Sequence, residues 1–363
     1  MTTTAPATAT SEELVGRLLE STIAAMDVFS VYLGEQLGYY RALHTDGPAT
    51  SGELAQRTGT HERYAREWLE QQTTTVILTV ADASAGPTER RYSLPAGYEE
   101  VLVNPQSEMF VAPVGRFVAS AAGQGAALLA AYRDGGGVSW ADFGQDARSA
   151  QADFNRPFFE NALVPGYISQ VPGLDVALNA PGARVAEIGF GGGWASIAMA
   201  KTYPNATVEG FEIDAPSVEM ARKNAADSGL AGRVTFHHRD AADAGIDGQC
   251  DLVCAFECIH DMPDPVSVLR TMRRLAKPGG TVLVMDERVG EEFGNVGDFT
   301  ERLLYGFSIA VCLPDGMSHQ PSVGTGTVMR PATFRKYATE AGFSGVEILP
   351  LEHDLFRFYR LLP

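Results

Sequence analysis

The chain has 363 residues, of which 45% are apolar and 20% are charged, proportions typical of a folded globular protein. No apolar run reaches the roughly 18 residues that a membrane-spanning helix needs. Four cysteines favour a reducing compartment over a disulfide scaffold, and a net charge of −17 disfavours binding to phosphate backbones. We therefore expect a cytoplasmic protein of two domains that binds neither nucleic acid nor membrane.

The N-terminal part of the chain predicts helices rather than alternating strands and helices. Residues 1–11 have neither the basic start nor the apolar segment of a signal peptide, and they predict a disordered leader. Residues 14–43 carry apolar side chains at mixed helical spacings, which predicts one long helix or two consecutive ones.

A winged-helix domain is predicted over residues 12–108. The segments TSGELAQRTGT (50–60) and ERYAREWLEQQ (62–72) predict a helix–turn–helix, with N-caps at Thr50 or Ser51 and at Thr60. TVILTV (75–80) and RYSL (91–94) predict the two strands of the wing. The second helix carries three glutamates against two arginines, the opposite of what a DNA-reading helix needs. Dimerisation, or covering a substrate pocket, is the favoured role.

The remainder of the chain predicts a helical connector followed by an α/β domain. Residues 109–179 predict helices around a glycine-rich link at 134–137, and we expect them to contribute to a substrate pocket. Residues 180–363 alternate strands (184–188, 206–211, 233–237, 251–256, 281–286) with helices (193–203, 216–228, 265–276). A turn at 277–280 ends the last of these helices, and VEILPL and LFRFYRLL predict a closing hairpin.

The stretch VAEIGFGGGWASIAMA, residues 185–200, predicts a buried strand, a glycine turn and an apolar helix. A dinucleotide fingerprint needs a third glycine where Trp194 stands, and a P-loop needs a Gly-Lys pair that is absent. The turn instead contains Glu187, Gly189, Gly191 and Gly193. An acidic residue two positions before the first glycine repels a pyrophosphate and suits a cationic ligand.

Two further carboxyl groups follow neighbouring strands. Glu212 ends the second strand, where a carboxylate accepts both ribose hydroxyls, and Asp240 follows the third strand, within reach of an adenine amino group. Three acidic residues at successive strand ends predict a site for a positively charged adenosine compound. S-adenosylmethionine has a sulfonium, an ammonium and no phosphate, and it is the predicted cofactor.

Residues 180–363 resemble the class I S-adenosylmethionine-dependent methyltransferases, and with the winged helix the chain resembles an actinobacterial-type family similar to small-molecule O-methyltransferases. The motifs that carry the likeness are GGGWASIA, FECIHDMPDP, ERLLYGFS, CLPDGM, GTGTVMRP and RFYRL. The resemblance implies a Rossmann-like seven-stranded α/β domain with a reversed last strand. Phe190 stands where such families often have a small residue. The implied cofactor-binding residues are Glu187, Gly189, Gly191, Gly193, Glu212, Ile213, Asp240, Ala241, Phe256 and Glu257.

The resemblance also implies a reaction. Small-molecule O-methyltransferases carry a general-base histidine in an HDW segment after the fourth strand, and this chain has His260, Asp261 and Met262 there. Histidine suits the task because its ordinary pKa lies near the working pH. We expect O-methylation of a small molecule, with His260 and Asp261 as catalytic residues, by a homodimer formed through the N-terminal domain. A structural role for His260, capping a helix or bonding the backbone, stays open.

Two other functions stay open at this level. His260, Asp261 and His319 are a candidate ligand set for a metal ion with open positions that a 2-oxo acid can fill as a chelating ligand. The two histidines are 59 residues apart in the sequence. A non-catalytic S-adenosylmethionine-binding transcriptional regulator is the other alternative. The long segment 291–331 supplies the substrate-pocket candidates, which are Glu301, Arg302, Tyr305, His319 and Arg330.

Overall fold

The computed structural model describes residues 10–243, 248–294 and 296–363. Contacts divide the chain into two compact units, one ending at Ala119 and the other beginning at Ser120. Among the described residues, none of the helices combines the length and the apolarity that crossing a membrane requires.

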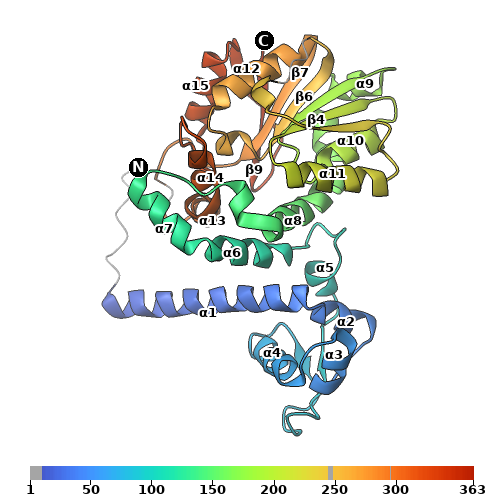
Figure 1. The fold of residues 1–363 in the computed structure, drawn as a ribbon, viewed down its shortest axis with the longest axis vertical. Coiled ribbons are helices and arrows are strands. Elements are labelled where there is room, and N and C mark those ends of the chain that lie inside the picture. Colours follow the sequence, from blue (N-terminus) through green and yellow to red (C-terminus); the bar gives the residue numbers. More distant parts are fainter. Residues whose placement is uncertain (1–9, 244–247, 295) are drawn as a thin grey trace. The chain divides into compact units, whose positions relative to one another are not determined.

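The N-terminal unit is mostly helical, as the sequence predicts (Figure 1). Its elements are α1 (Ser11–Gln36), α2 (Tyr39–Thr45), α3 (Ser51–Thr58), α4 (Glu62–Thr74), β1 (Thr79–Val80), β2 (Tyr92–Ser93), α5 (Glu99–Leu102) and α6 (Pro113–Gly123), which continues past the boundary. The predicted leader is two residues too long, because Thr10 and Glu13 form a capping box that starts α1 at Ser11. The rest of the leader, residues 1–9, lies outside the described residues.

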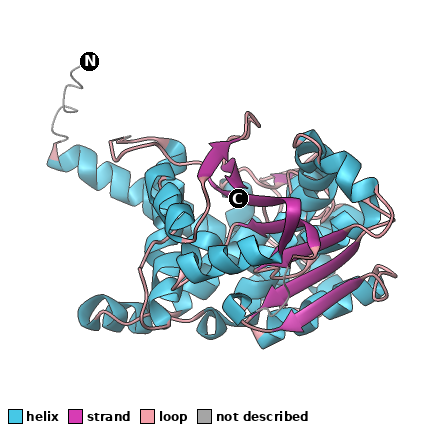
Figure 2. Ribbon diagram, turned by 90° about the horizontal axis from the view of Figure 1, so that it is seen from above, coloured by secondary structure: helices cyan, strands magenta, loops and turns pink. Residues whose placement is uncertain are grey.

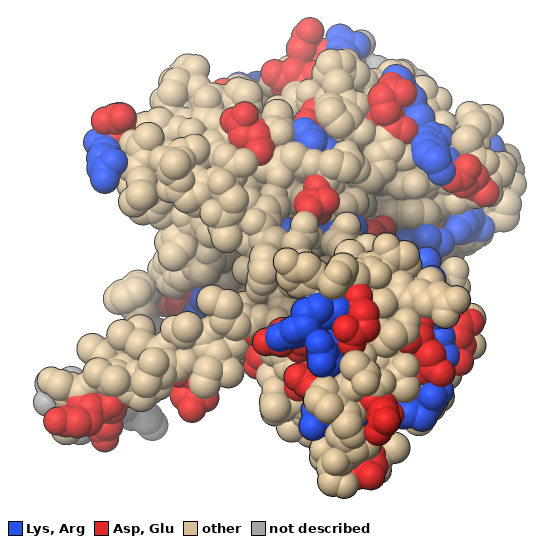
Figure 3. Space-filling view, turned by 60° about the horizontal axis from the view of Figure 1, so that its bottom comes forward, with Lys and Arg blue, Asp and Glu red and all other residues tan. Residues whose placement is uncertain are grey.

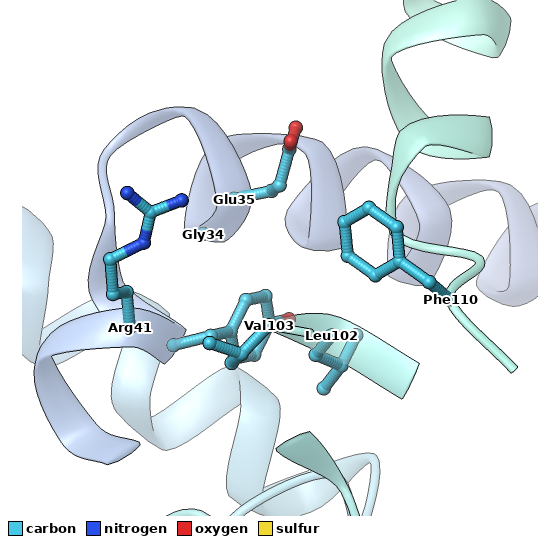
Figure 4. A pocket seen from close by; sticks show the side chains of 7 residues that line it. Gly34, Glu35, Arg41, Leu102, Val103 and Phe110 are labelled. Carbon is cyan, nitrogen blue, oxygen red and sulfur yellow. The ribbon is translucent and has the colours of Figure 1, made fainter. Parts of the chain in front are cut away.

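The winged helix has the predicted order, with α3 and α4 followed by the antiparallel pair β1 and β2. Thr50 caps α3 through the amide of Glu53, as predicted. The predicted cap of α4 at Thr60 is wrong. The Thr60 hydroxyl is engaged by the hydroxyl of Tyr39 at 2.9 Å, and His61 caps the helix by accepting the Arg63 amide. A cavity of about 30 Å³ beneath Gly34, lined also by Leu102 and Phe110 (Figure 4), holds at most one water.

The C-terminal unit is an α/β domain. Its elements are α7 (Gly125–Asp134), α8 (Trp140–Phe158), η1 (Phe159–Tyr167), η2 (Ile168–Gln170), α9 (Leu174–Asn179), β3 (Arg184–Ile188), α10 (Trp194–Thr202), β4 (Thr207–Glu212), α11 (Ala215–Asp227), β5 (Val234–His238), η3 (Ala241–Asp243), β6 (Cys250–Phe256), η4 (Ile259–Asp261), α12 (Pro265–Leu275), β7 (Ala276–Glu287), α13 (Phe299–Phe307), η5 (Ser308–Cys312), α14 (Leu313–Ser318), α15 (Pro331–Glu340), β8 (Gly345–Ile348) and β9 (Phe356–Leu362).

Seven strands form one sheet in the order β5-β4-β3-β6-β7-β9-β8. The first five are parallel, and β9 runs antiparallel to both β7 and β8. This confirms the predicted Rossmann-like sheet with a reversed strand. Helices cover both faces (Figure 2), and each face has its own core. Successive residues of β3 alternate between the two cores, with Val185 in one and Ala186 in the other.

The predicted turn at residues 277–280 is only partly correct. Strand β7 begins at Ala276, which pairs with Cys250, and pairing resumes with Thr281 opposite Leu252. The intervening Lys-Pro-Gly-Gly segment therefore bulges out of the strand. Gly279 has a φ of 78°, which a non-glycine residue adopts at a cost.

Candidate active site

The glycine turn after β3 requires glycine at two positions because neighbouring atoms leave no room for a side chain. A Cβ on Gly193 would lie 2.5 Å from Phe236 Cζ, and the residue has a φ of 75°. A Cβ on Gly192 would lie 2.6 Å from the Cβ of Ala152 on α8. The turn thus brings its backbone against both the sheet and α8, and it opens helix α10.

Two of the predicted cofactor carboxylates lie at adjacent strand ends. Glu187 near the end of β3 is 2% exposed and accepts a hydrogen bond from the Ser196 hydroxyl. Burial, with a smaller contribution from the nearby Glu212, raises the Glu187 pKa to about 7 in spite of the hydrogen bonds from Ser196. Burial also raises the pKa of Glu212, although its carboxylate accepts the amides of Gly191, Ile213 and Asp214 at 3.3, 2.8 and 3.1 Å.

The predicted adenine end is more open. Asp240 is exposed, and its Oδ1 accepts the Ala242 amide at 2.8 Å. The side chain of Ile213 is 53% exposed, while Ala241 and Phe256 are buried. An exposed apolar side chain suits packing against a purine, and an exposed carboxylate suits acceptance of a hydrogen bond from its amino group.

Glu257, directly after β6, has a backbone conformation that non-glycine residues seldom adopt. Its φ is 54°, which costs roughly 1–2 kcal/mol. Its Oε1 is buried and accepts a hydrogen bond from none of the described residues. Burial raises the Glu257 pKa to about 8, although His260 and a hydrogen bond from Asn155 oppose that rise. Strain and an unpartnered acceptor in one residue indicate a ligand site.

These carboxyl groups fit the predicted cofactor. Burial raises the pKa values of Glu187, Glu212 and Glu257, and that of Asp315 to about 7. Repulsion between neighbouring carboxylates adds to the increase, as between Asp315 and both Glu212 and Asp261. A cationic ligand removes this repulsion and supplies donors to the unpartnered oxygen, whereas a pyrophosphate increases the repulsion.

His260 lies next to these groups, in the short helix η4 after β6. It is 2% exposed, and both ring nitrogens contact carboxylates. Nδ1 lies 2.8 Å from Asp286 Oδ1 and 2.9 Å from Glu287 Oε2, and Nε2 lies 2.9 Å from Asp261 Oδ1. Burial lowers the His260 pKa, but Asp261, Glu287 and Asp286 together raise it well above its usual value.

Asp286 and Glu287 are site residues that the sequence did not indicate. They end β7, the strand beside β6, and both are buried. Burial raises the Asp286 pKa, but the charge of His260 and hydrogen bonds from Glu287 and His260 together outweigh it and keep that pKa below its usual range. Burial, together with Asp286, raises the Glu287 pKa well above its usual value. The sequence signal that could have indicated them is a pair of acidic residues at the carboxyl end of the strand predicted at 281–286.

The structure groups His260 with other potential metal ligands than those predicted. Among the described residues, one group contains His260, Asp261 and Cys312, and a second contains His260, Asp286 and Glu287. His319 belongs to neither and is exposed at the end of α14. The predicted set of His260, Asp261 and His319 is therefore not assembled.

Three substrate-pocket candidates contact one another. Arg330 binds both carboxylate oxygens of Glu301, at 3.2 and 3.3 Å, and lies 3.4 Å from the Tyr305 hydroxyl. Arg330 also donates to the carbonyls of Gly290 and Glu292, so this cluster ties α13 to the segment after β7. Beside it lies an apolar pocket of about 450 Å³, lined by Glu301, Arg302, Tyr305 and the apolar residues Phe293, Val296 and Ile309.

Comparisons with known proteins agree with this architecture. Residues 179–305 match a family described as a methyltransferase domain, and residues 24–103 match the Rv2258c-like winged HTH domain. The ubiquinone biosynthesis O-methyltransferase of Pseudomonas aeruginosa is 35% identical over 113 residues, which are 31% of this chain and 47% of that protein. The chain thus spans about half the length of that relative.

Solved structures share the whole fold. PigF with SAH superposes with a TM-score of 0.73 at 18% identity, over 98% of this chain and 100% of that one. The mitomycin 7-O-methyltransferase MmcR superposes with a TM-score of 0.65 at 22% identity, over 97% of each chain. Together with the two domain matches, these likenesses give one conclusion. The chain carries a methyltransferase domain over residues 179–305 and an Rv2258c-like winged helix-turn-helix domain over residues 24–103.

Proposed function

We propose that the protein transfers a methyl group from S-adenosylmethionine to an oxygen atom of a small molecule, with His260 as the general base. The observation that supports this most is the position of His260. It is buried beside the strand ends that carry the proposed cofactor residues, and buried carboxylates hold its Nδ1. The O-methyltransferases among the similar proteins support oxygen as the methylated atom.

The proposed cofactor residues divide by the part of the ligand they suit. Glu212 suits the ribose hydroxyls, Asp240 and Ile213 suit the adenine, and Glu187 and Glu257 suit the cationic methionine end. Gly189, Gly191 and Gly193 let the backbone approach, and Ala241 and Phe256 complete the walls. When bound, S-adenosylmethionine supplies a methyl group already activated by its sulfonium.

The contact with buried Asp286 fixes the tautomer of His260. Asp286 accepts the Nδ1 proton, which leaves Nε2 as the nitrogen that can take a proton. Asp261, whose side chain is 31% exposed, contacts Nε2 and is the member of the pair open to an acceptor. The acceptor hydroxyl therefore has to replace or share the Asp261 contact, and its proton passes to Nε2 as the oxygen attacks the methyl carbon.

The acceptor pocket and the oligomeric state follow from other parts of the chain. The proposed acceptor-binding parts are residues 109–179 and the segment with Glu301, Tyr305, His319 and Arg330.

A homodimer through the N-terminal domain is supported by the apolar side chains that are exposed along α1 and at the residue that follows it. These are Leu14, Val15, Leu18, Leu19, Ile23, Met26, Phe29, Leu33 and Leu37.

Acceptor-dependent product formation tests the proposal. The protein is incubated with S-adenosylmethionine and a panel of phenols and hydroxylated heterocycles, and both S-adenosylhomocysteine and the methylated product are measured by mass spectrometry. The expected result is release of S-adenosylhomocysteine only with certain acceptors, together with a product one CH₂ unit heavier that carries the methyl group on oxygen. Methylation of nitrogen or carbon would reject the O-methylation part of the proposal.

A metal-dependent methyltransferase is the second candidate, because His260, Asp261 and Cys312 approach one another closely. The regulator has less support. Both arginines of α4 are ion-paired, Arg63 with Glu67 at 2.5 Å and Arg66 with Glu62 at 3.4 Å. On the face that Figure 3 shows, basic side chains lie among acidic ones, and large areas carry neither. Specific DNA binding in a gel shift at physiological salt would favour the regulator.

A further inference from the structure

One face of α8 contacts the ends of three strands that carry proposed cofactor residues. Arg148 binds Asp214 after β4, Ala152 packs under Gly192 after β3, and the amide of Asn155 bonds the carboxylate of Glu257 after β6. Arg148, Ala152 and Asn155 are four and three residues apart, which places them on one side of a helix. A single helical face therefore touches all three loops.

The strongest of these contacts is an ion pair. Arg148 Nε lies 2.6 Å from Asp214 Oδ2, and Nη2 lies 2.8 Å from Oδ1. Both side chains are more than nine-tenths buried. Burial raises the Asp214 pKa, but hydrogen bonds from Arg148 and Ser217 outweigh it and hold that pKa below its usual value. The planar two-point contact fixes Asp214 in both position and orientation.

Asp214 is also part of the loop that shapes the Glu212 carboxylate. It caps α11 by accepting the amide and hydroxyl of Ser217 at 3.0 and 2.6 Å. Its own amide donates to Glu212 Oε1 at 3.1 Å, beside the amide of Ile213 at 2.8 Å. The backbone between Glu212 and Asp214 is thus fixed at one end by the Glu212 carboxylate and at the other by Arg148.

We propose that Arg148 is a positioning residue for cofactor binding, which acts through Asp214 to hold the Glu212 loop in the conformation that receives the ribose. The inference rests on the proposed function, because it assigns Glu212 to S-adenosylmethionine. The hydrogen bonds that Arg148 makes among the described residues go to Asp214, so its proposed role is indirect. Its place on the connector helix also links the proposed acceptor-binding part of the chain to the cofactor loops.

The test has to separate positioning from the cost of a buried unpaired charge. A single Arg148→Met variant leaves Asp214 buried without its partner, and an unpaired buried charge is enough to unfold a protein. The double variant Arg148→Met with Asp214→Asn removes both charges and keeps a good helix cap, because asparagine caps as well as aspartate. Arg184→Met with Glu209→Gln is the matched control, since it removes another ion pair, of 2.6 Å, between β3 and β4.

The measurements are calorimetric titrations with S-adenosylmethionine and S-adenosylhomocysteine, and hydrogen exchange of the ligand-free proteins. The expected result is about tenfold weaker binding of both ligands by the Arg148/Asp214 double variant, with a change of less than about twofold in the control. The amides of Ile213 and Asp214 should exchange faster in the double variant alone. In steady state, KM for S-adenosylmethionine should rise while kcat changes little.

Each outcome decides a different claim. A folded double variant that binds both ligands with wild-type affinity, or that exchanges no faster at Ile213 and Asp214, would overturn the role of Arg148. A wild-type protein that binds neither ligand would instead reject the proposed function itself. Equal weakening in the control would show that affinity follows general stability, and it would also overturn the positioning role.

Discussion

The Nδ1 atom of His260 lies 2.8 Å from Oδ1 of Asp286, and both side chains are almost completely buried. This contact sets the ring orientation and the tautomer, because a nitrogen that donates to a carboxylate cannot also take the proton of an acceptor. It also supplies part of the negative charge that raises the His260 pKa. The orientation of the proposed base therefore comes from the end of the neighbouring strand, while Asp261 in η4 contributes most to the rise of its pKa.

Replacing His260 by glutamine tests the base role. The substitution keeps a polar side chain of similar size but removes the proton acceptor, so kcat should fall by about 10²–10⁴-fold. Cofactor affinity should change little, which calorimetry measures. His44→Gln, on the exposed face of α2, is the control and should retain full turnover. Full turnover in the His260 variant would leave that residue with only a structural role.

The raised His260 pKa predicts the direction in which the rate changes with pH. A general base works as neutral imidazole, so kcat/KM should increase as the pH rises through a pKa above 6.5 and should be low below it. The contribution of charged His260 to the stability of the fold changes with pH in the opposite direction. It is fully present below the unfolded pKa and is lost as the pH rises through the folded one. A rate that decreases over this range would contradict the assignment.

Cofactor affinity should depend on pH through the buried carboxyl groups. Glu187 and Glu257 titrate with pKa values of about 7 and about 8, and their ionised forms attract a cation. Binding of S-adenosylmethionine should therefore strengthen as the pH rises from 6 to 9 and should release protons. S-adenosylhomocysteine lacks the sulfonium charge and should show a weaker dependence. Titrations in two buffers of different ionisation enthalpy measure both effects, and Glu187→Gln should reduce the slope.

The sequence predicted the sheet and the loops that follow its strands well because both follow from local patterns. The strand predicted at 184–188 is the whole of β3, and Glu212 ends β4 as expected. Contacts across the fold were not predictable in this way. The approach of Asp286 to His260 depends on strand order, and that of Arg148 to Asp214 depends on how α8 docks. Neither leaves a periodic signal in the residues concerned.

Chelation separates the metal-free base from the metal alternative. His260 is already held by three carboxylates, so we expect that EDTA or a ferrous chelator leaves turnover unchanged. Elemental analysis of protein purified without chelator is the companion measurement. Inactivation by chelator with recovery on adding ferrous or zinc ion would instead support a site at His260, Asp261 and Cys312.

Light scattering at micromolar concentration tests the dimer. The exposed apolar side chains of α1 predict a mass of two chains. Ile23→Arg places a charge among them and should shift the protein towards a single chain mass. Val176→Arg on α9 changes an equally apolar and more exposed residue outside the N-terminal domain, and it should leave the dimer intact. A wild-type protein of one chain mass would reject the dimer.

Removing Glu212 should abolish most of the stabilisation that the cofactor gives. A ligand selective for the folded state adds about 2.7 kcal/mol at a concentration 100 times its Kd, and a 100-fold weaker Kd removes nearly all of it. Thermal unfolding of Glu212→Ala with and without S-adenosylmethionine measures the loss. Glu209→Ala, on the same strand but paired with Arg184, is the control and should keep the ligand-induced shift.

Calorimetric titration of the wild-type protein with S-adenosylmethionine and, separately, with NAD tests the central claim most directly. The three acidic strand ends predict saturable binding of one S-adenosylmethionine per chain and no binding of NAD, whose pyrophosphate would face Glu187 and Glu212. Binding of NAD with no binding of S-adenosylmethionine would contradict the assignment of the cofactor, because the glycine turn would then hold a phosphate group.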